Sequence, residues 1–135
     1  EQKINSKNLD VAVDLPEHPV YTRADKDAVT QVVYNLIDNA VKFCTEGGTL
    51  GLKLAEGGGK IYVTVANEGN TIPPEELPLV FDRFHKIDKA RNRSQEGWGL
   101  GLYIVKTLVC SHGENISVAS RDGRTEFTFT MPLVN

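Results

Sequence analysis

The fold of this chain is decided by the stretch from Asp25 to Cys44, which reads DKDAVTQVVYNLIDNAVKFC. Its apolar residues recur three and four positions apart, the spacing of an amphipathic helix, and no glycine or proline interrupts them. Asp25 is placed to cap the first turn. We therefore predict a helix over 25–44 whose buried stripe comprises Val29, Val32, Val33, Leu36, Ile37, Ala40 and Val41.

The segments around this helix predict a mixed order of strands and helices. Leu9–Leu15 alternates apolar and acidic residues and predicts a half-buried strand. Pro73 and Pro74 are typical of the first turn of a short helix. Further predictions are hairpins over 49–55 with 60–66 and over 116–120 with 125–131, a mobile polar loop between 84 and 99, and a second helix over 100–112. The expected fold class is α+β, an α/β sandwich with helices on one face of a mostly antiparallel mixed sheet.

Composition limits the classes of function. The 135 residues suffice for one domain, which we expect to span 1–135 and to be monomeric. A net charge of -3 gives no reason to expect nucleic acid as a partner. No apolar run is long enough to cross a membrane, and no signal peptide is evident. Cys44 and Cys110 lack metal-ligand spacing, which favours a reduced, cytoplasmic setting.

A polar stripe lies on the first helix, where Gln31, Asn35 and Asn39 are four residues apart and Asp38 and Lys42 are close by. We expect it opposite the apolar stripe. Asn is a poor helix former, so its recurrence is unusual. One interpretation is a solvated face; the other is a pair of amide oxygens facing Mg²⁺, with the remaining ligands supplied by a polyphosphate and water.

Two glycine-containing segments are further candidates. The run 65–73, VANEGNTIP, follows a predicted strand and is either a turn or a binding loop. The run 97–102, GWGLGL, leads directly into a helix, where main-chain amides and the helix dipole form an anion site. Alone, each segment is weak evidence for a ligand.

Taken in order, these motifs resemble the catalytic and ATP-binding domain of bacterial sensor histidine kinases, within the Bergerat or GHKL ATPase family. QVVYNLIDNAVKF at 31–43 is similar to the N box of that family, and NEGNTI at 67–72 to its first glycine box. FDRF at 81–84 resembles the F box, GWGLGL at 97–102 the second glycine box, and RTEFTFTMP at 124–132 the closing strand. The resemblance spans essentially the whole chain.

The resemblance implies a role for each matching residue. Asn35, Asn39 and Lys42 are implied to be catalytic, with Asn39 and then Asn35 at Mg²⁺ and Lys42 at a phosphate. The residues implied to bind ATP are Asn67, Gly69 and Ile72 at the base, Arg83, Phe84 and Lys86 at the start of the lid, Gly97, Gly99, Leu100, Gly101 and Leu102 around the phosphates, and Thr125 at the adenine end.

The implied activity is that of a protein-histidine kinase, which binds Mg-ATP and donates its γ-phosphoryl group to a histidine on a separate dimerisation domain. That domain and, indirectly, a response regulator are the implied partners, and the setting is the cytoplasmic part of a membrane-bound sensor. No dimerisation or phosphoacceptor segment is recognisable in 1–135. Gln31 stands where ATP hydrolases of the wider family have Glu, which favours transfer over hydrolysis.

Two residues depart from the family pattern. Asn67 replaces the carboxylate that reads adenine, and Thr71 replaces a glycine. An amide oxygen accepts a hydrogen bond less strongly than a carboxylate, so weaker nucleotide binding is expected. The alternative function is therefore a degenerate ATP-binding or regulatory module with weak or no phosphotransfer.

Overall fold

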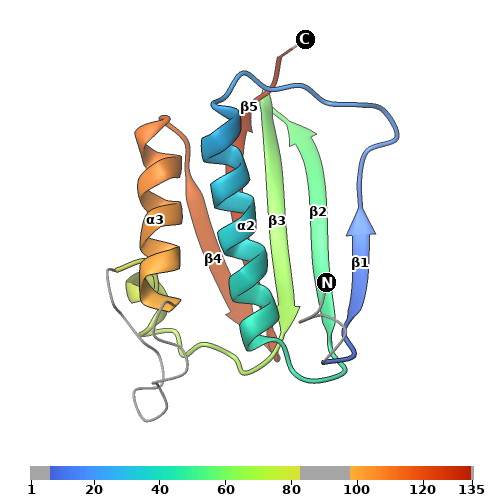
Figure 1. Ribbon diagram of the computed structural model, residues 1–135, viewed down its shortest axis with the longest axis vertical. Helices are drawn as coiled ribbons and strands as arrows, with labels where there is room; N and C mark the ends of the chain where they lie inside the picture. Colours follow the sequence, from blue (N-terminus) through green and yellow to red (C-terminus); the bar gives the residue numbers. More distant parts are fainter. Residues whose placement is uncertain (1–6, 83–97, 135) are drawn as a thin grey trace.

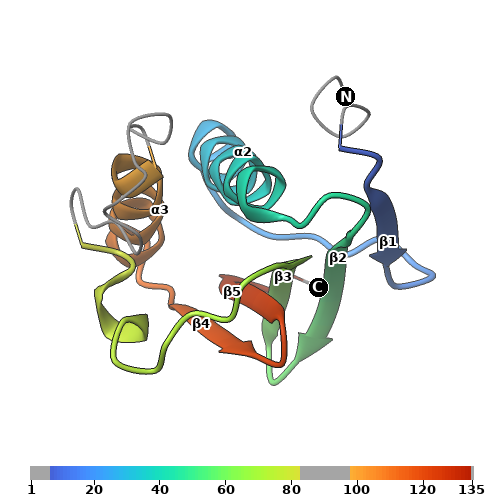
Figure 2. The same ribbon diagram turned by 90° about the horizontal axis from the view of Figure 1, so that it is seen from below.

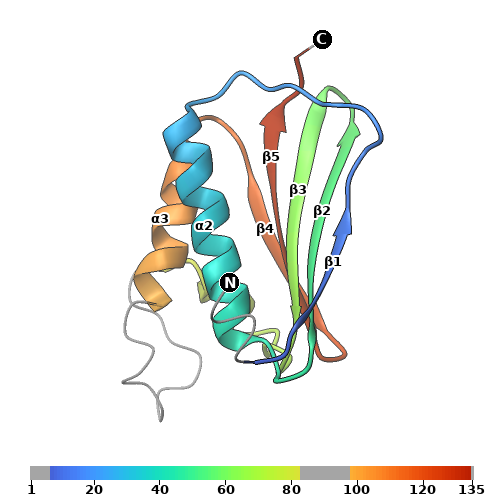
Figure 3. The ribbon, with the colours of Figure 1, turned by 45° about the vertical axis from the view of Figure 1, so that its right-hand side comes forward.

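The computed structural model describes residues 7–82 and 98–134. Its elements in chain order are β1 (Asp10–Asp14), α2 (Lys26–Phe43), β2 (Thr49–Gly57), β3 (Lys60–Glu68), the short 3₁₀ helix η1 (Leu77–Leu79), α3 (Trp98–Ser111), β4 (Ile116–Arg121) and β5 (Arg124–Pro132). The five strands form one sheet in the order β1-β2-β3-β5-β4. Both helices lie on the same face of this sheet (Figure 1, Figure 3). The predicted two-layer α+β fold is confirmed.

The sheet is mixed, with mostly antiparallel pairings. β2 pairs with β3, β3 with β5 and β4 with β5, all antiparallel. β1 and β2 run parallel, because α2 lies between them in the chain and carries it back across the sheet. The strand ends consequently separate into two groups, and the carboxyl end of β3 lies beside the amino end of β5.

α2 begins and ends where side chains satisfy its free backbone groups. At its start, Oδ1 of Asp25 accepts hydrogen bonds from the amides of Asp27 and Ala28 at 2.9 and 3.4 Å. At its end, Nζ of Lys7 donates to the carbonyl oxygens of Val41, Lys42 and Cys44 at 2.8, 2.9 and 3.2 Å. A cation at these carbonyls also complements the helix dipole. The N-cap was predictable from sequence, and the lysine cap was missed.

The core lies between the two helices and the sheet. Leu36 of α2 and Val105 of α3 are fully buried, and Ile61 of β3 and Phe129 of β5 are almost so. Among the described residues, no helix is both long and apolar enough to cross a membrane. The core is therefore that of a two-layer sandwich, with the polar ends of its strands and helices available for a site.

Two local predictions were wrong. The strand β1 is exposed rather than half-buried, because Val11 and Val13 are 53% and 55% exposed, and Leu15 just after the strand is 54% exposed. The reason is its position at the sheet edge, away from α2 and α3 (Figure 2). The short helix expected to begin at Pro73 is instead η1, which begins at Leu77, after a turn closed by the bond from the Glu76 amide to the Pro73 carbonyl.

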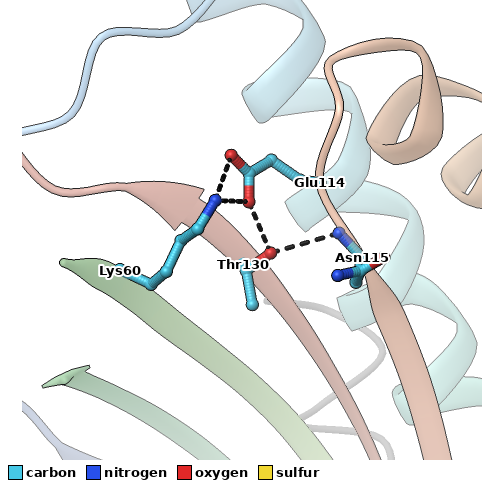
Figure 4. A network of polar contacts seen from close by, with 4 residues as sticks. All are labelled: Lys60, Glu114, Asn115 and Thr130. Atoms are coloured by element: carbon cyan, nitrogen blue, oxygen red, sulfur yellow. Dashed lines mark hydrogen bonds and ion pairs between the residues drawn. The ribbon is translucent and has the colours of Figure 1, made fainter. Parts of the chain in front are cut away.

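A partly buried ion pair braces the end of the sheet where β5 finishes. Nζ of Lys60 lies 2.8 and 2.9 Å from the two carboxylate oxygens of Glu114, and Oγ1 of Thr130 donates to Oε1 of Glu114 at 2.6 Å (Figure 4). The amide of Asn115 completes the network by donating to Oγ1 of Thr130. Because these residues come from β3, from β5 and from the segment before β4, the network fixes how the strands meet the end of α3.

Candidate functional site

The polar segments singled out by sequence converge at one end of the sandwich. The carboxyl ends of α2, β3 and β4 lie there with the amino ends of α3 and β5 (Figure 1), and Figure 2 views the molecule from this end. The direction of each element fixes this arrangement, because α2 runs down the sheet and α3 runs back up. Segments far apart in the sequence thus form one candidate site.

The amide stripe of α2 faces α3. Nδ2 of Asn35 donates to the main-chain oxygen of Gly101 at 3.3 Å, a contact between residues 66 positions apart. Oδ1 of Asn35 accepts from Nε2 of Gln31 at 2.9 Å. The stripe is therefore beside the apolar face rather than opposite it as predicted, because α3 packs against that side of α2.

The next turns of α2 present a buried amide and a cation. Asn39 is only 9% exposed, although Asn is usually found at protein surfaces. Nζ of Lys42 lies 3.3 Å from Oδ2 of Asp38, with both side chains less than a third exposed. The ion pair with Asp38 holds the Lys42 ammonium group one turn beyond Asn39 on α2, and its contact with a phosphate stays a prediction.

The oxygen and nitrogen atoms of these side chains indicate which metal ion the candidate site could bind. In the part of the chain that the structure describes, no group of three or more His, Cys, Asp or Glu residues could hold one. Mg²⁺ does not require such a group, because it accepts a few amide or carboxylate oxygens together with phosphate oxygens and water. Asn39 carries an amide oxygen of the type that fits this role, and both ends of the Asn35 amide bind Gly101 and Gln31. Metal contacts from Asn39 and from Asn35 therefore both stay predictions.

A wall of buried polar side chains forms the part of the candidate site that the resemblance assigns to the base. Asn67 and Thr125 face one another in the register of β3 and β5, and they are 4% and 5% exposed. Oγ1 of Thr125 lies 2.8 Å from Oγ of Ser120, which also accepts the amide of Ile72 at 2.8 Å. The structure thus brings together three predicted residues, Asn67, Ile72 and Thr125. Ser120 was missed, since a serine in a short strand carries no signal of its own.

The loop after β3 is clamped between α2 and the β4–β5 turn. The amide of Gly69 donates to the Gly123 oxygen at 2.9 Å, and the Gly123 amide donates to Oγ1 of Thr71 at 2.7 Å. A Cβ atom on Gly69 would lie 2.5 Å from the oxygen of Phe43, so only glycine fits there. The hydroxyl of Thr71, which replaces a family glycine, therefore closes the clamp.

The remaining predicted residues belong to the second glycine box and the lid. Arg83, Phe84, Lys86 and Gly97, with most of the predicted mobile loop, lie outside the described residues. Gly99, Leu100, Gly101 and Leu102 lie in the first turns of α3. A Cβ atom on Gly101 would meet no atom within 4 Å, whereas the Leu102 side chain is 2% exposed in the core. Their ligand contacts stay predictions.

The fold and site together define a class of two-layer sandwich in which an amide-bearing helix faces a glycine-rich helix start. The family described as "Histidine kinase-, DNA gyrase B-, and HSP90-like ATPase" matches residues 24–135, and the chain belongs to that family. The predicted family is confirmed.

The curated proteins similar to this chain include sensor histidine kinases. Sensor histidine kinase WalK of Bacillus subtilis is 43% identical over 122 residues, which are 88% of this chain and 20% of WalK. Sensor histidine kinase YcbM of the same species is 36% identical over 129 residues, covering 95% of this chain and 42% of YcbM. The chain thus spans less than half the length of these curated relatives.

Solved structures agree with this assignment. The nucleotide-free catalytic domain of histidine kinase ThkA superposes with a TM-score of 0.83 at 26% identity, covering 97% of this chain and 83% of that domain. Full-length ShkA in complex with AMPPNP superposes with a TM-score of 0.82 at 28% identity, covering 99% of this chain and 27% of ShkA. The chain therefore has the fold of histidine kinase catalytic domains.

Proposed function

We propose that residues 1–135 form a histidine kinase catalytic domain that binds Mg-ATP and donates the γ-phosphoryl group to a histidine on a separate dimerisation domain. The observation that carries the proposal is the bond from Nδ2 of Asn35 to the oxygen of Gly101. It joins the amide stripe to the glycine-rich start of α3, so that amides, a lysine and a helix amino terminus lie at the same end of the sandwich. This combination suits a triphosphate with its metal.

Each predicted residue takes one part of the nucleotide. We assign Mg²⁺ to Asn39, which lies one helical turn from the hydrogen bond between Asn35 and Gly101. We assign a phosphate to Lys42. The amides of Gly97, Gly99 and Gly101, with Leu100 and Leu102 between and after them, surround the terminal phosphates at the positive end of the α3 dipole. Arg83, Phe84 and Lys86 form the start of the lid in this assignment.

The base lies against the opposite wall in this proposal. Asn67 and Thr125 meet its polar edge, while Gly69 and Ile72 shape the pocket around it. The clamp through Thr71 and Gly123 supports this assignment, because the hydrogen bonds of the protein itself hold the loop in place. A wall that is ordered in advance reduces the entropy lost on binding.

Transfer to histidine requires positioning and neutralisation of charge more than a covalent protein catalyst. A nitrogen of the acceptor imidazole attacks the γ-phosphorus, a phosphorus–nitrogen bond forms, the bond to the bridging oxygen breaks, and ADP leaves. Bound Mg²⁺ supplies neutralisation of the phosphate charge. Gln31 cannot remove a proton from water at neutral pH, so hydrolysis does not compete through this residue.

The partners follow from this assignment. The acceptor histidine belongs to the dimerisation domain of the same kinase, and the phosphoryl group passes from it to a response regulator. A structure of histidine kinase ThkA in complex with response regulator protein TrrA shows such a pairing for another kinase. The cytoplasm is the compartment in which ATP and both partners meet.

Calorimetric titration with AMPPNP, with and without Mg²⁺, tests the binding step. We expect saturable binding that Mg²⁺ strengthens, and loss of the Mg²⁺-dependent part in Asn39→Ala. Asn115→Ala is the matched control, because Asn115 is exposed at the other end of the sandwich. An Asn39→Ala protein that folds and keeps its full Mg²⁺ dependence would remove Asn39 from the metal site.

Transfer is tested with γ-labelled ATP and the dimerisation helices of a histidine kinase added in trans. We expect label on the acceptor histidine that is stable to base and labile to acid. Absence of labelled acceptor, with nucleotide binding intact, would favour a regulatory ATP-binding module over a kinase.

A further inference from the structure

The base wall is built from groups that can each donate or accept a hydrogen bond. Asn67 carries a carboxamide, and Thr125 and Ser120 carry hydroxyls. A carboxylate at position 67 would only accept. The polar character of this wall therefore differs from that of a family member with Asp in the first glycine box, and the difference bears on which purine it admits.

The carboxamide of Asn67 retains hydrogen-bonding capacity for a ligand. Its side chain is on the helix-facing side of β3, the same side as buried Val63 and Val65. Nδ2 of Asn67 donates to the main-chain oxygen of the adjacent Glu68 at 3.4 Å, which is long for a hydrogen bond. Turning the amide by half a rotation exchanges its oxygen and nitrogen and gives up this one long hydrogen bond, so either atom can meet a base.

The hydroxyl pair has the same freedom. Ser120 Oγ already accepts the amide of Ile72, and the 2.8 Å contact between Ser120 and Thr125 is formed equally well with either oxygen as donor. When Ser120 donates, the Thr125 proton is available to an acceptor on the ligand. When Thr125 donates, its remaining lone pair is available to a donor. The direction of the hydrogen bond between Ser120 and Thr125 can thus reverse while Ser120 keeps its bond to the Ile72 amide.

We infer that this site accepts 6-oxopurine nucleotides such as GTP alongside ATP. Adenine presents an amino group as donor at C6 and an acceptor at N1, whereas guanine presents an acceptor at C6 and a donor at N1. A buried carboxylate rejects guanine because two acceptors then face each other without a proton. The carboxamide and the hydroxyl pair meet both patterns by reorientation. This inference rests on the proposed binding of the purine at Asn67.

The test compares Mg²⁺ complexes of AMPPNP and GMPPNP by calorimetry on the wild-type chain and on Asn67→Asp. We expect the two dissociation constants of the wild type to agree within about tenfold, and the substitution to tighten AMPPNP while weakening GMPPNP. Their ratio should widen by at least about tenfold, the cost of one unpaired buried acceptor. Asn70→Asp is the matched control, since it makes the same charge change on an exposed loop residue and should leave the ratio unchanged.

The outcomes separate the two levels of the argument. If the wild type binds AMPPNP but not GMPPNP, the proposed function stands and this inference is overturned. Equal binding of UTP would also overturn this inference, because the site would then not distinguish between bases. Binding of none of these nucleotides would overturn both. If Asn67→Asp does not fold, Thr125→Val replaces it: loss of the hydroxyl should weaken both purines by similar factors, and selective loss of AMPPNP alone would contradict the reversible wall.

Discussion

Replacing Gly69 with alanine tests how the loop after β3 is held against α2. The added Cβ would lie 2.5 Å from the main-chain oxygen of Phe43 and 3.2 Å from Nδ2 of Asn67. Carbon and oxygen atoms that are not bonded need at least about 3.0 Å, so the loop or the end of α2 must move by about 0.5 Å. Because the oxygen belongs to the backbone, no side-chain rotation relieves the contact.

The expected loss follows from this forced movement. Overpacking of a well-packed site typically costs about 1–3 kcal/mol of unfolding free energy. For 135 residues, an unfolding entropy of about 2.1 cal/mol/K per residue gives about 0.28 kcal/mol/K, so the melting temperature should fall by about 4–11 °C. The proximity to Asn67 adds a second effect, because the shifted loop displaces the base wall and weakens AMPPNP binding.

Thermal unfolding followed by circular dichroism measures the first effect, and calorimetric titration measures the second. Gly57→Ala is the control, since its Cβ would approach only Tyr62 at 4.0 Å and the φ angle is not positive. It reports the general effect of Gly→Ala on the unfolded chain. A Gly69→Ala protein that melts within about 1 °C of Gly57→Ala and binds AMPPNP normally would refute the assignment of Gly69 to a close backbone approach.

Three further predictions concern other parts of the structure. Gly101→Ala meets no atom within 4 Å and lies inside α3, so it should stabilise the fold by about 0.5–1 kcal/mol in urea unfolding; a destabilised variant would contradict this. Burial tends to raise the pKa of Glu114, but hydrogen bonds from Lys60 and a threonine and the lysine charge outweigh it and lower that pKa below its usual value. The stability from ionised Glu114 is therefore present above its unfolded pKa and lost as pH falls through its folded pKa. Glu114→Gln should be less stable at pH 7, with the difference from wild type disappearing in acid, and a difference that does not change with pH would be inconsistent with the pair. Burial raises the pKa of the Cys44 thiol, so a maleimide should label exposed Cys110 in the native protein and Cys44 only after unfolding, as read by peptide mass spectrometry; equal native labelling rates would contradict the buried placement.

Local pattern predicted the elements whose environment is set by their own residues. The helix over 25–44 was found because seven apolar residues keep one spacing and Asp25 caps the start, and the structure places α2 at Lys26–Phe43. The same reasoning failed for β1. Alternation shows that Val11 and Val13 share one face of a strand, but it carries no information on whether a helix covers that face.

The candidate site was predictable as residue types but not as contacts. Spacing placed Asn35 and Asn39 on one side of a helix, and the glycine run marked the start of another. That Asn35 binds Gly101 depends on how α2 and α3 pack, which no periodicity reveals. The sequence did not predict Ser120 as a site residue for a related reason. Its role comes from hydrogen bonds to Ile72 and Thr125, which lie in two other segments.

Thr71 and Asn67, the two residues that depart from the family motif, have different physical consequences. Together they therefore do not favour a degenerate module. Thr71 acts on the structure: its hydroxyl accepts the Gly123 amide at 2.7 Å, which holds the loop on the β4–β5 turn. In the proposed site Asn67 acts on the ligand, because a carboxamide donates as well as accepts where a carboxylate only accepts. Loss of function would leave such positions without a partner or a defined place. Here one side chain completes a clamp and the other is 4% exposed beside Thr125. The pair is more consistent with a site whose base recognition has changed than with one whose binding has decayed.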